Sequence, residues 1–166
     1  MVSPRTASAL TPALVAILAL AWASASATAQ SDDSRAAVSR TADSQRSSYQ
    51  GAAVRATNSA RVRHDLVALD ADQCLQHFAV QQAKAMAQQE SMYHQDLGPI
   101  MRACGLGLVG ENVAYGYASG REVVQGWMHS PGHRANILNR GFRVVAVAAR
   151  ESASGRWYAA QVFGRR

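Results

Sequence analysis

The segment from Trp127 to Asn139 constrains the fold of this chain more than any other part of its sequence. It runs Trp-Met-His-Ser-Pro-Gly-His-Arg-Ala-Asn-Ile-Leu-Asn, so a Pro-Gly pair follows the polar end of an apolar-periodic stretch. His133 comes directly after that pair, and a second short apolar segment follows it. Adjacent proline and glycine mark a turn. The sequence therefore predicts two short helical pieces joined by a sharp turn that carries an imidazole.

The first 29 residues have the features of a secretory signal peptide. Arg5 is the only charged residue before Asp32, residues 13–22 form an apolar run, and Ala27-Thr28-Ala29 supplies an A-x-A cleavage site. The run is shorter than the ~20 residues of a membrane-spanning helix. An uncleaved N-terminal anchor is the alternative, but the A-x-A site favours cleavage. We expect an exported, extracellular protein that is not integral to the membrane.

Two further segments are predicted after the signal peptide. Residues 30–46 are rich in Ser, Ala, Asp, Arg and Gln without apolar periodicity, which is typical of a disordered leader. Residues 47–166 are long enough for one domain with its own core. The net charge of +6 predicts adhesion to anionic wall polymers or membrane surfaces. The basic residues are scattered without aromatic side chains among them, which argues against nucleic-acid binding.

Apolar periodicity and capping signals predict helices followed by a C-terminal hairpin. The clearest helix has an apolar stripe that includes Leu75, Ala79, Ala83 and Met86, with Asp70 as its expected N-cap and an end near residue 89 or 90. Other helices are expected over residues 47–63, over 99–103 and after Ser119, and strands over 111–115, 142–149 and 157–163. This order favours an antiparallel sheet covered by helices over a βαβ arrangement.

The chain contains two cysteines, Cys74 and Cys104. In an oxidising compartment they are expected to form a disulfide, and two buried free thiols are the alternative. Closing a loop of about 30 residues would stabilise the fold by roughly 3–4 kcal/mol. The absence of a C-x-x-C pattern argues against a thiolate zinc site.

Three stretches in this order carry a family resemblance: Gly110-Glu111-Asn112, the segment from Trp127 to Asn139, and Gln161-Val162-Phe163-Gly164. Together they resemble the CAP superfamily of cysteine-rich secretory, antigen-five and pathogenesis-related proteins, in particular its short bacterial branch. The resemblance extends from about Asn58 to Gly164. It implies an α+β fold, a three-layer α-β-α sandwich with a small antiparallel sheet covered by helices and a functional groove between them.

The resemblance also implies a site. Full CAP domains place two His and two Glu around a cavity that can hold a divalent metal, and the two histidines match His94 and His133. The first glutamate matches Glu111, whereas the second falls on Ser130, so the four-residue set is incomplete. The implied cavity residues are therefore His94, Glu111, His133 and Ser130, with His94 and His133 as the metal ligands.

Two imidazoles and a carboxylate suit zinc, with a position left open for water. Alternatively only the histidines would bind the metal, and Glu111 would accept a proton from the bound water as the catalytic base. Each residue also has a structural alternative. His94 could satisfy helix-end carbonyls, Glu111 could be a buried acceptor for backbone amides, and His133 could brace the Pro-Gly turn. Ser130 lacks the Gly-x-Ser-x-Gly context of a nucleophile elbow.

Three functions follow from these patterns. The favoured one is a secreted, monomeric binding module for a lipid, a cell-surface polymer or a protein, which requires no cofactor. A metal-dependent hydrolase, a protease or esterase using zinc or another divalent cation in the same cavity, is the enzymatic alternative. The third is a structural wall-associated domain retained by its positive charge.

Overall fold

The computed structural model of the chain describes residues 19–166, and the first 18 residues of the expected signal peptide lie outside that range. The described chain divides into two units, one ending at Ala42 and one from Asp43 to Arg166. Helix α1 (Ala19–Val62) contains residues of both. Within the described residues, no helix combines the length and the apolarity needed to cross a membrane.

Residues 30–46 are helical in the structure, whereas the sequence analysis predicted disorder for them. The cause is local, because no glycine or proline occurs between Ala19 and Gln50 and alanine, arginine and glutamine favour the helix. The missing apolar periodicity was still informative, since the side chains of residues 33–40 are exposed. The expected boundaries at residues 29 and 46 stay predictions.

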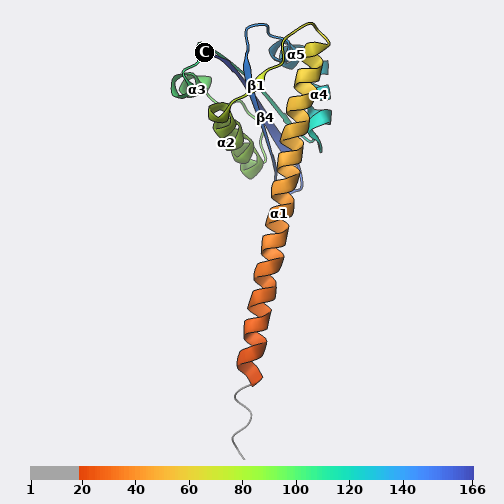
Figure 1. The fold of residues 1–166 in the computed structure, drawn as a ribbon, viewed down its shortest axis with the longest axis vertical. Coiled ribbons are helices and arrows are strands. Elements are labelled where there is room, and N and C mark those ends of the chain that lie inside the picture. Colours follow the sequence, from red (N-terminus) through yellow and green to blue (C-terminus); the bar gives the residue numbers. More distant parts are fainter. Residues whose placement is uncertain (1–18) are drawn as a thin grey trace, which may run out of the picture. The chain divides into compact units, whose positions relative to one another are not determined.

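The unit from Asp43 to Arg166 contains the end of α1 and eight further elements, which Figure 1 labels where there is room. These are β1 (Asp70–Ala71), α2 (Gln73–Gln89), α3 (Leu97–Cys104), β2 (Leu108–Tyr115), α4 (Gly120–His129), α5 (Pro131–Ile137), β3 (Val144–Glu151) and β4 (Trp157–Arg165). The helix-turn-helix expected around the Pro-Gly pair corresponds to α4 and α5.

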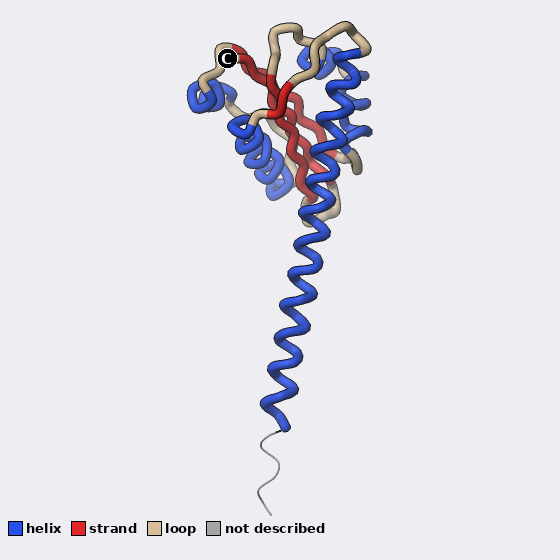
Figure 2. The backbone as a smooth tube through the Cα atoms, in the orientation of Figure 1, coloured by secondary structure: helices blue, strands red, loops and turns tan. Residues whose placement is uncertain are grey.

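The four strands form one sheet in the order β1-β3-β4-β2, drawn in red in Figure 2. Strand β4 pairs antiparallel with both β2 and β3, as expected for the C-terminal hairpin. The two-residue β1 joins β3 in parallel, so the sheet is mixed rather than purely antiparallel as predicted. The register places Asn112 opposite Gln161, which brings two of the sequence motifs side by side.

Each face of the sheet has its own hydrophobic core. One core packs α1, α4 and α5 onto the sheet and includes Tyr49, Trp127 and Phe163. The other packs α2 and α3 onto the opposite face and includes Leu75 and Ile100. Side chains alternate between the faces of a strand, so β4 contributes to both cores. This confirms the three-layer α-β-α sandwich.

Helix α2 begins two residues later than predicted. Its N-cap is Asp72, whose carboxylate accepts a hydrogen bond from the backbone N of Leu75, and Asp70 instead pairs with Val144 in β1. Both residues have the short carboxylate that N-caps favour. Strand pairing with β3 decides between them, and that pairing is long-range.

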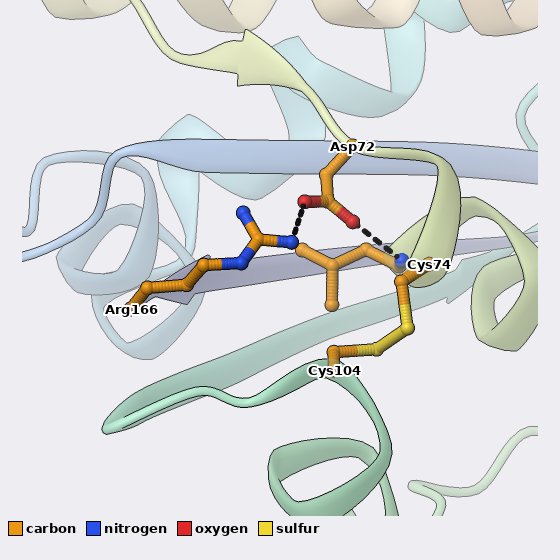
Figure 3. Close-up of a disulfide and its surroundings, with 5 residues drawn as sticks. Asp72, Cys74, Cys104 and Arg166 are labelled. Atoms are coloured by element: carbon orange, nitrogen blue, oxygen red, sulfur yellow. Dashed lines mark hydrogen bonds and ion pairs between the residues drawn. A yellow bond between two sulfur atoms is a disulfide. The ribbon is translucent and has the colours of Figure 1, made fainter.

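The disulfide between Cys74 and Cys104 is formed, which confirms the expected pair. It joins the first turn of α2 to the end of α3. Figure 3 shows Asp72 beside the disulfide, paired with Arg166. The Oδ2 atom of Asp72 accepts a hydrogen bond from Nη2 of Arg166 at 2.8 Å. The start of α2 is thus held by a cap, an ion pair and a covalent bond.

Candidate functional site

The polar residues predicted to share a site come from three different elements. His94 lies in the connection between α2 and α3. This connection begins at Glu90, the C-cap of α2, whose backbone is in the left-handed conformation (φ 48°). Glu111 lies in β2, and His133 lies in the first turn of α5, just after the Pro131-Gly132 pair. Only the tertiary fold can bring them together.

Glu111 is the centre of this cluster. Its side chain is 1% exposed, and its Oε2 atom lies 2.8 Å from Nδ1 of His94. The backbone N of Gln95 also donates to Oε2, at 3.3 Å, and the side-chain amide of Gln95 donates to Oε1 at 2.6 Å. Both carboxylate oxygens are therefore engaged. The imidazole of His94 is 58% exposed, and its Nδ1 atom forms the hydrogen bond to Glu111.

His133 is half-buried at the start of α5. Burial lowers the pKa of its imidazole, and the positive charge of His94 lowers that pKa further. His94 thus acts on the ring of His133 through its charge, and the backbone carbonyl of His133 is joined to β2 by the Asn112 amide. His133 is accordingly held toward its neutral form.

A buried amide network lies behind these residues. The side-chain amide of Asn112 donates to the carbonyl of His133 and to Oε1 of Gln161, both at 3.1 Å. The amide of Asn136 donates to the carbonyl of Glu111 and to Oδ1 of Asn112, both at 2.9 Å. This network fixes the α5 turn against β2 and joins the Gly-Glu-Asn motif to the Gln-Val-Phe-Gly motif. The sequence motifs alone did not indicate that Asn112 and Gln161 belong to the site.

Ser130 is the remaining predicted cavity residue. It precedes α5 as its N-cap, without a side-chain capping bond, and its carbonyl accepts from the backbone N of Arg134 at 2.8 Å. Among the described contacts, none joins its hydroxyl to Glu111, His94 or His133. Nothing in this geometry activates Ser130 as a nucleophile.

The described residues do not fit a three-ligand zinc site. Within residues 19–166, no group of three His, Cys, Asp or Glu side chains is placed to hold a cation. Glu111 uses its oxygens to accept hydrogen bonds from His94 and Gln95, so it orients the imidazole as metal-site carboxylates do from outside the coordination sphere. Two imidazoles remain, fewer than the three protein ligands of ordinary catalytic zinc sites.

A second site candidate, which the sequence analysis missed, is a groove of about 590 Å³ between α1 and α4. Its lining combines apolar and cationic side chains and contains no carboxylate. The residues are Ala52, Arg55, Ala56, Ser59, Ala60, Arg63, Arg121, Val124, Gln125, Met128 and His129. A signal was available, because Ala52, Ala56 and Ala60 recur every four residues and hence share one face of a helix.

The cations of this groove are free to meet a ligand. Arg55, Arg63 and Arg121 are exposed, and none of them forms an ion pair among the described contacts. The buried side chains of Ala60 and Val124 contribute apolar surface to the lining. The groove thus combines a mixed polar and apolar lining with a positively charged rim, and we call it the α1–α4 groove.

Comparisons with known proteins agree with this fold. Residues 54–163 match the model of the Cysteine-rich secretory protein family, CAP. The chain is 34% identical over 117 residues to the uncharacterized protein YkwD of Bacillus subtilis (strain 168), covering 65% of this chain and 45% of that protein. The chain therefore spans less than half the length of that relative.

Two solved structures are similar. An extracellular protein of Bacillus anthracis that contains an SCP domain has a TM-score of 0.66 and 30% identity, over 73% of this chain and 41% of that one. An outer surface protein of Borrelia burgdorferi has a TM-score of 0.60 and 21% identity, over 68% of this chain and 89% of that one. The second likeness concerns the fold alone.

Proposed function

The chain belongs to the cysteine-rich secretory protein (CAP) family, and from that membership we propose that it is an exported, monomeric binding module for an anionic amphiphile such as a lipid. The signal-peptide features and the disulfide support export, because disulfides persist in oxidising compartments. The description of a structural neighbour as extracellular supports it further.

The α1–α4 groove is the observation that carries this proposal. Its volume of about 590 Å³ lies within the ~300–1,000 Å³ of small-molecule sites. An acyl chain would pack against Ala56, Val124 and Met128, and a carboxylate or phosphate head would meet the guanidinium groups at the rim. Guanidinium groups bind such oxyanions through paired hydrogen bonds.

The cluster of Glu111, His94 and His133 supports a second ligand contact. A buried carboxylate that holds an exposed imidazole presents a hydrogen-bonding group in a fixed orientation, so little entropy is lost on binding. We propose that this cluster contacts a polar part of the ligand or of a protein partner. Its chemistry in this proposal is hydrogen bonding, without a catalytic step.

The groove is tested with the chain itself and three probes: oleate, phosphatidylglycerol vesicles and phosphatidylcholine vesicles. We expect oleate and phosphatidylglycerol to bind and phosphatidylcholine to bind at least fivefold more weakly. Arg55→Gln and Arg121→Gln should each weaken oleate binding at least fivefold. Arg102→Gln, an exposed substitution on α3, is the matched control and should leave binding unchanged.

Other outcomes separate the remaining functions. Binding to isolated cell wall that moderate salt abolishes, with no affinity for oleate, would contradict the lipid proposal and favour a wall-associated structural domain, since exposed charges are screened. Binding that His94→Ala removes but Arg55→Gln leaves intact would place the ligand at the cluster instead of the groove.

The zinc-dependent hydrolase is the enzymatic alternative, and the melting temperature tests it. A metal that binds the native state raises the melting temperature by mass action. Because the described residues supply only two imidazoles, we expect about 100 µM zinc to leave the melting temperature unchanged. A rise in melting temperature that His133→Ala removes would favour the hydrolase.

A further inference from the structure

Two hollows adjoin at the end of the sheet where the β2–α4 loop, the β3–β4 hairpin and residues 44–52 of α1 meet. Their volumes are about 340 and 370 Å³, and both are bounded by Ala118 and Trp157. One is lined by Gly116, Tyr117, Ala118, Ser154, Gly155, Arg156 and Trp157. The other is lined by Ser44, Gln45, Ser48, Tyr49, Ala52, Ala118, Ser119 and Trp157. We call the pair the Trp157 groove.

The indole of Trp157 is held in one orientation. Its ring stacks on Tyr49 with centroids 5.2 Å apart and planes 14° from parallel. Tyr49 is itself only 4% exposed, and its hydroxyl donates to the carbonyl of Tyr117 at 3.3 Å. The carbonyl of Trp157 accepts from the backbone N of Gly116 at 2.8 Å, where a positive φ of 85° requires glycine. Trp157 is therefore a rigid, half-buried wall between the hollows.

Two further aromatic side chains are exposed at this end of the sheet, and one of them, Tyr117, lines the groove. Tyr115 is 50% exposed and Tyr117 is 36% exposed. The ring of Tyr115 stacks on buried Tyr158 with centroids 5.9 Å apart, and the guanidinium of Arg156 lies 5.5 Å from its centroid. Tyr158 belongs to the core on the α2–α3 face, so Tyr115 lies on the opposite face of the sheet from Trp157 and lines neither hollow. The stacking of Trp157 on Tyr49 means that a ligand in the groove would meet an aromatic surface that is already ordered.

The polar groups of the groove select the kind of ligand. They are hydroxyls and one amide, from Ser44, Ser48, Ser119, Ser154 and Gln45, and the lining contains no carboxylate. Hydroxyls and amides both donate and accept hydrogen bonds. Arg156 is the only charged side chain in the lining, and it lies against Tyr115. A strongly charged ligand thus finds little complementarity here.

We propose that the Trp157 groove binds a neutral, hydroxyl-rich glycan chain, with Trp157 between two adjacent sugar positions. The face of an aromatic ring is negative and attracts the polarised C–H groups on one face of a pyranose. The serine hydroxyls and the Gln45 amide would exchange hydrogen bonds with the sugar hydroxyls. This site is separate from the lipid proposal, because the residues that carry it differ from those at the rim of the α1–α4 groove.

The test uses the whole chain and two soluble probes, cellotetraose and chitotetraose, titrated to about 5 mM and followed by NMR or calorimetry. At least one should bind, and Tyr117→Ala should weaken that binding at least threefold, whereas Tyr115→Ala, on the opposite face of the sheet, should leave it unchanged. Tyr93→Ala is the matched control, because Tyr93 is similarly exposed (37%) but follows α2. Trp157→Phe, which keeps a ring against Tyr49, should weaken binding less than Trp157→Ala.

Three outcomes would overturn the proposal. The first is the absence of binding by both sugars at about 5 mM while the variants and the parent are equally folded by circular dichroism. The second is binding that Tyr93→Ala weakens as much as Tyr117→Ala does. The third is oligosaccharide binding that Arg55→Gln removes, because it would place the sugar in the α1–α4 groove. Oleate binding measured in parallel tests the lipid proposal independently.

Discussion

The carboxylate of Glu111 lies beneath the exposed imidazole of His94, with Oε2 and Nδ1 2.8 Å apart. The side chain of Glu111 is 1% exposed, whereas that of His94 is 58% exposed. The pair fastens the connection between α2 and α3 to strand β2. A buried carboxylate needs hydrogen-bond donors to offset the loss of water, and His94 and Gln95 supply them. The relationship therefore stabilises the fold and orients a surface histidine at the same time.

Glu111→Gln should lower the free energy of unfolding by about 1–3 kcal/mol, because hydrogen bonds to a charged, buried acceptor are replaced by weaker or mismatched ones. Urea denaturation measures this loss. His64→Ala is the control, since His64 is exposed and outside the cluster, and it should change stability by less than about 0.5 kcal/mol. A Glu111→Gln variant as stable as the parent would show that the pair contributes little to the fold.

The imidazole of His133 should titrate below the ordinary histidine value of 6.5. Its folded-state pKa is lowered by burial and then by the charge of His94, so the unfolded chain binds more protons. As the pH falls from 6.5 toward the folded-state pKa, the unfolded chain takes up the proton first, so the free energy of unfolding decreases. Well above pH 6.5 His133 is neutral in both states and the effect is absent. NMR titration of the ring should show the low pKa, and His94→Ala should raise it. An unchanged value in His94→Ala would mean that the rings do not interact.

Asp72 should contribute an acid-sensitive part of the stability. Burial raises the pKa of its carboxyl, but hydrogen bonds from Leu75 and Arg166 outweigh that effect, so the pKa is lowered below 3.8. The contribution is present above the unfolded value and is lost as the pH falls through the folded one. Asp72→Ala should cost about 1 kcal/mol of cap energy at neutral pH. Asp72→Asn keeps a capping side chain, so it should destabilise the protein less than Asp72→Ala does. Its free energy of unfolding should also fall less steeply as the pH is lowered.

Gly120 should not tolerate a side chain, since a Cβ there would lie 2.5 Å from the backbone N of Ala53 and closer still to the carbonyl of Tyr49. Gly120→Ala should push α4 away from α1 and destabilise the protein by about 1–3 kcal/mol. Gly132 is the matched control, because its Cβ would meet nothing within 4 Å and it lies in helix α5. Gly132→Ala should be neutral or stabilising by up to ~1 kcal/mol, and thermal melting compares the two.

Much of the fold was predictable because its signals are local. The apolar stripe of α2, the capping position of Ser119 before α4 and the Pro-Gly turn before α5 each depend on neighbours a few residues away. The disulfide was predictable for a different reason, since only two cysteines are present. The misplaced N-cap at Asp70 shows the limit, because pairing with distant Val144 overrode an equally good local signal.

The candidate sites were less predictable. The family resemblance identified His94, Glu111 and His133, but the roles of these residues depend on which atoms meet. The structure directs the oxygens of Glu111 to His94 and Gln95, and it brings Asn112 opposite Gln161 in neighbouring strands. Neither motif on its own reveals that partnership.

The sequence by itself therefore determined the kinds of element, their order, the disulfide pair and the family, because helix periodicity, turn chemistry and motif order are written within short stretches of chain. Tertiary structure alone decided the hydrogen-bond partners of Glu111, the α1–α4 groove and the Trp157 groove. Each of those features is made by side chains from elements distant in sequence, and their meeting depends on how helices pack on the two faces of the sheet.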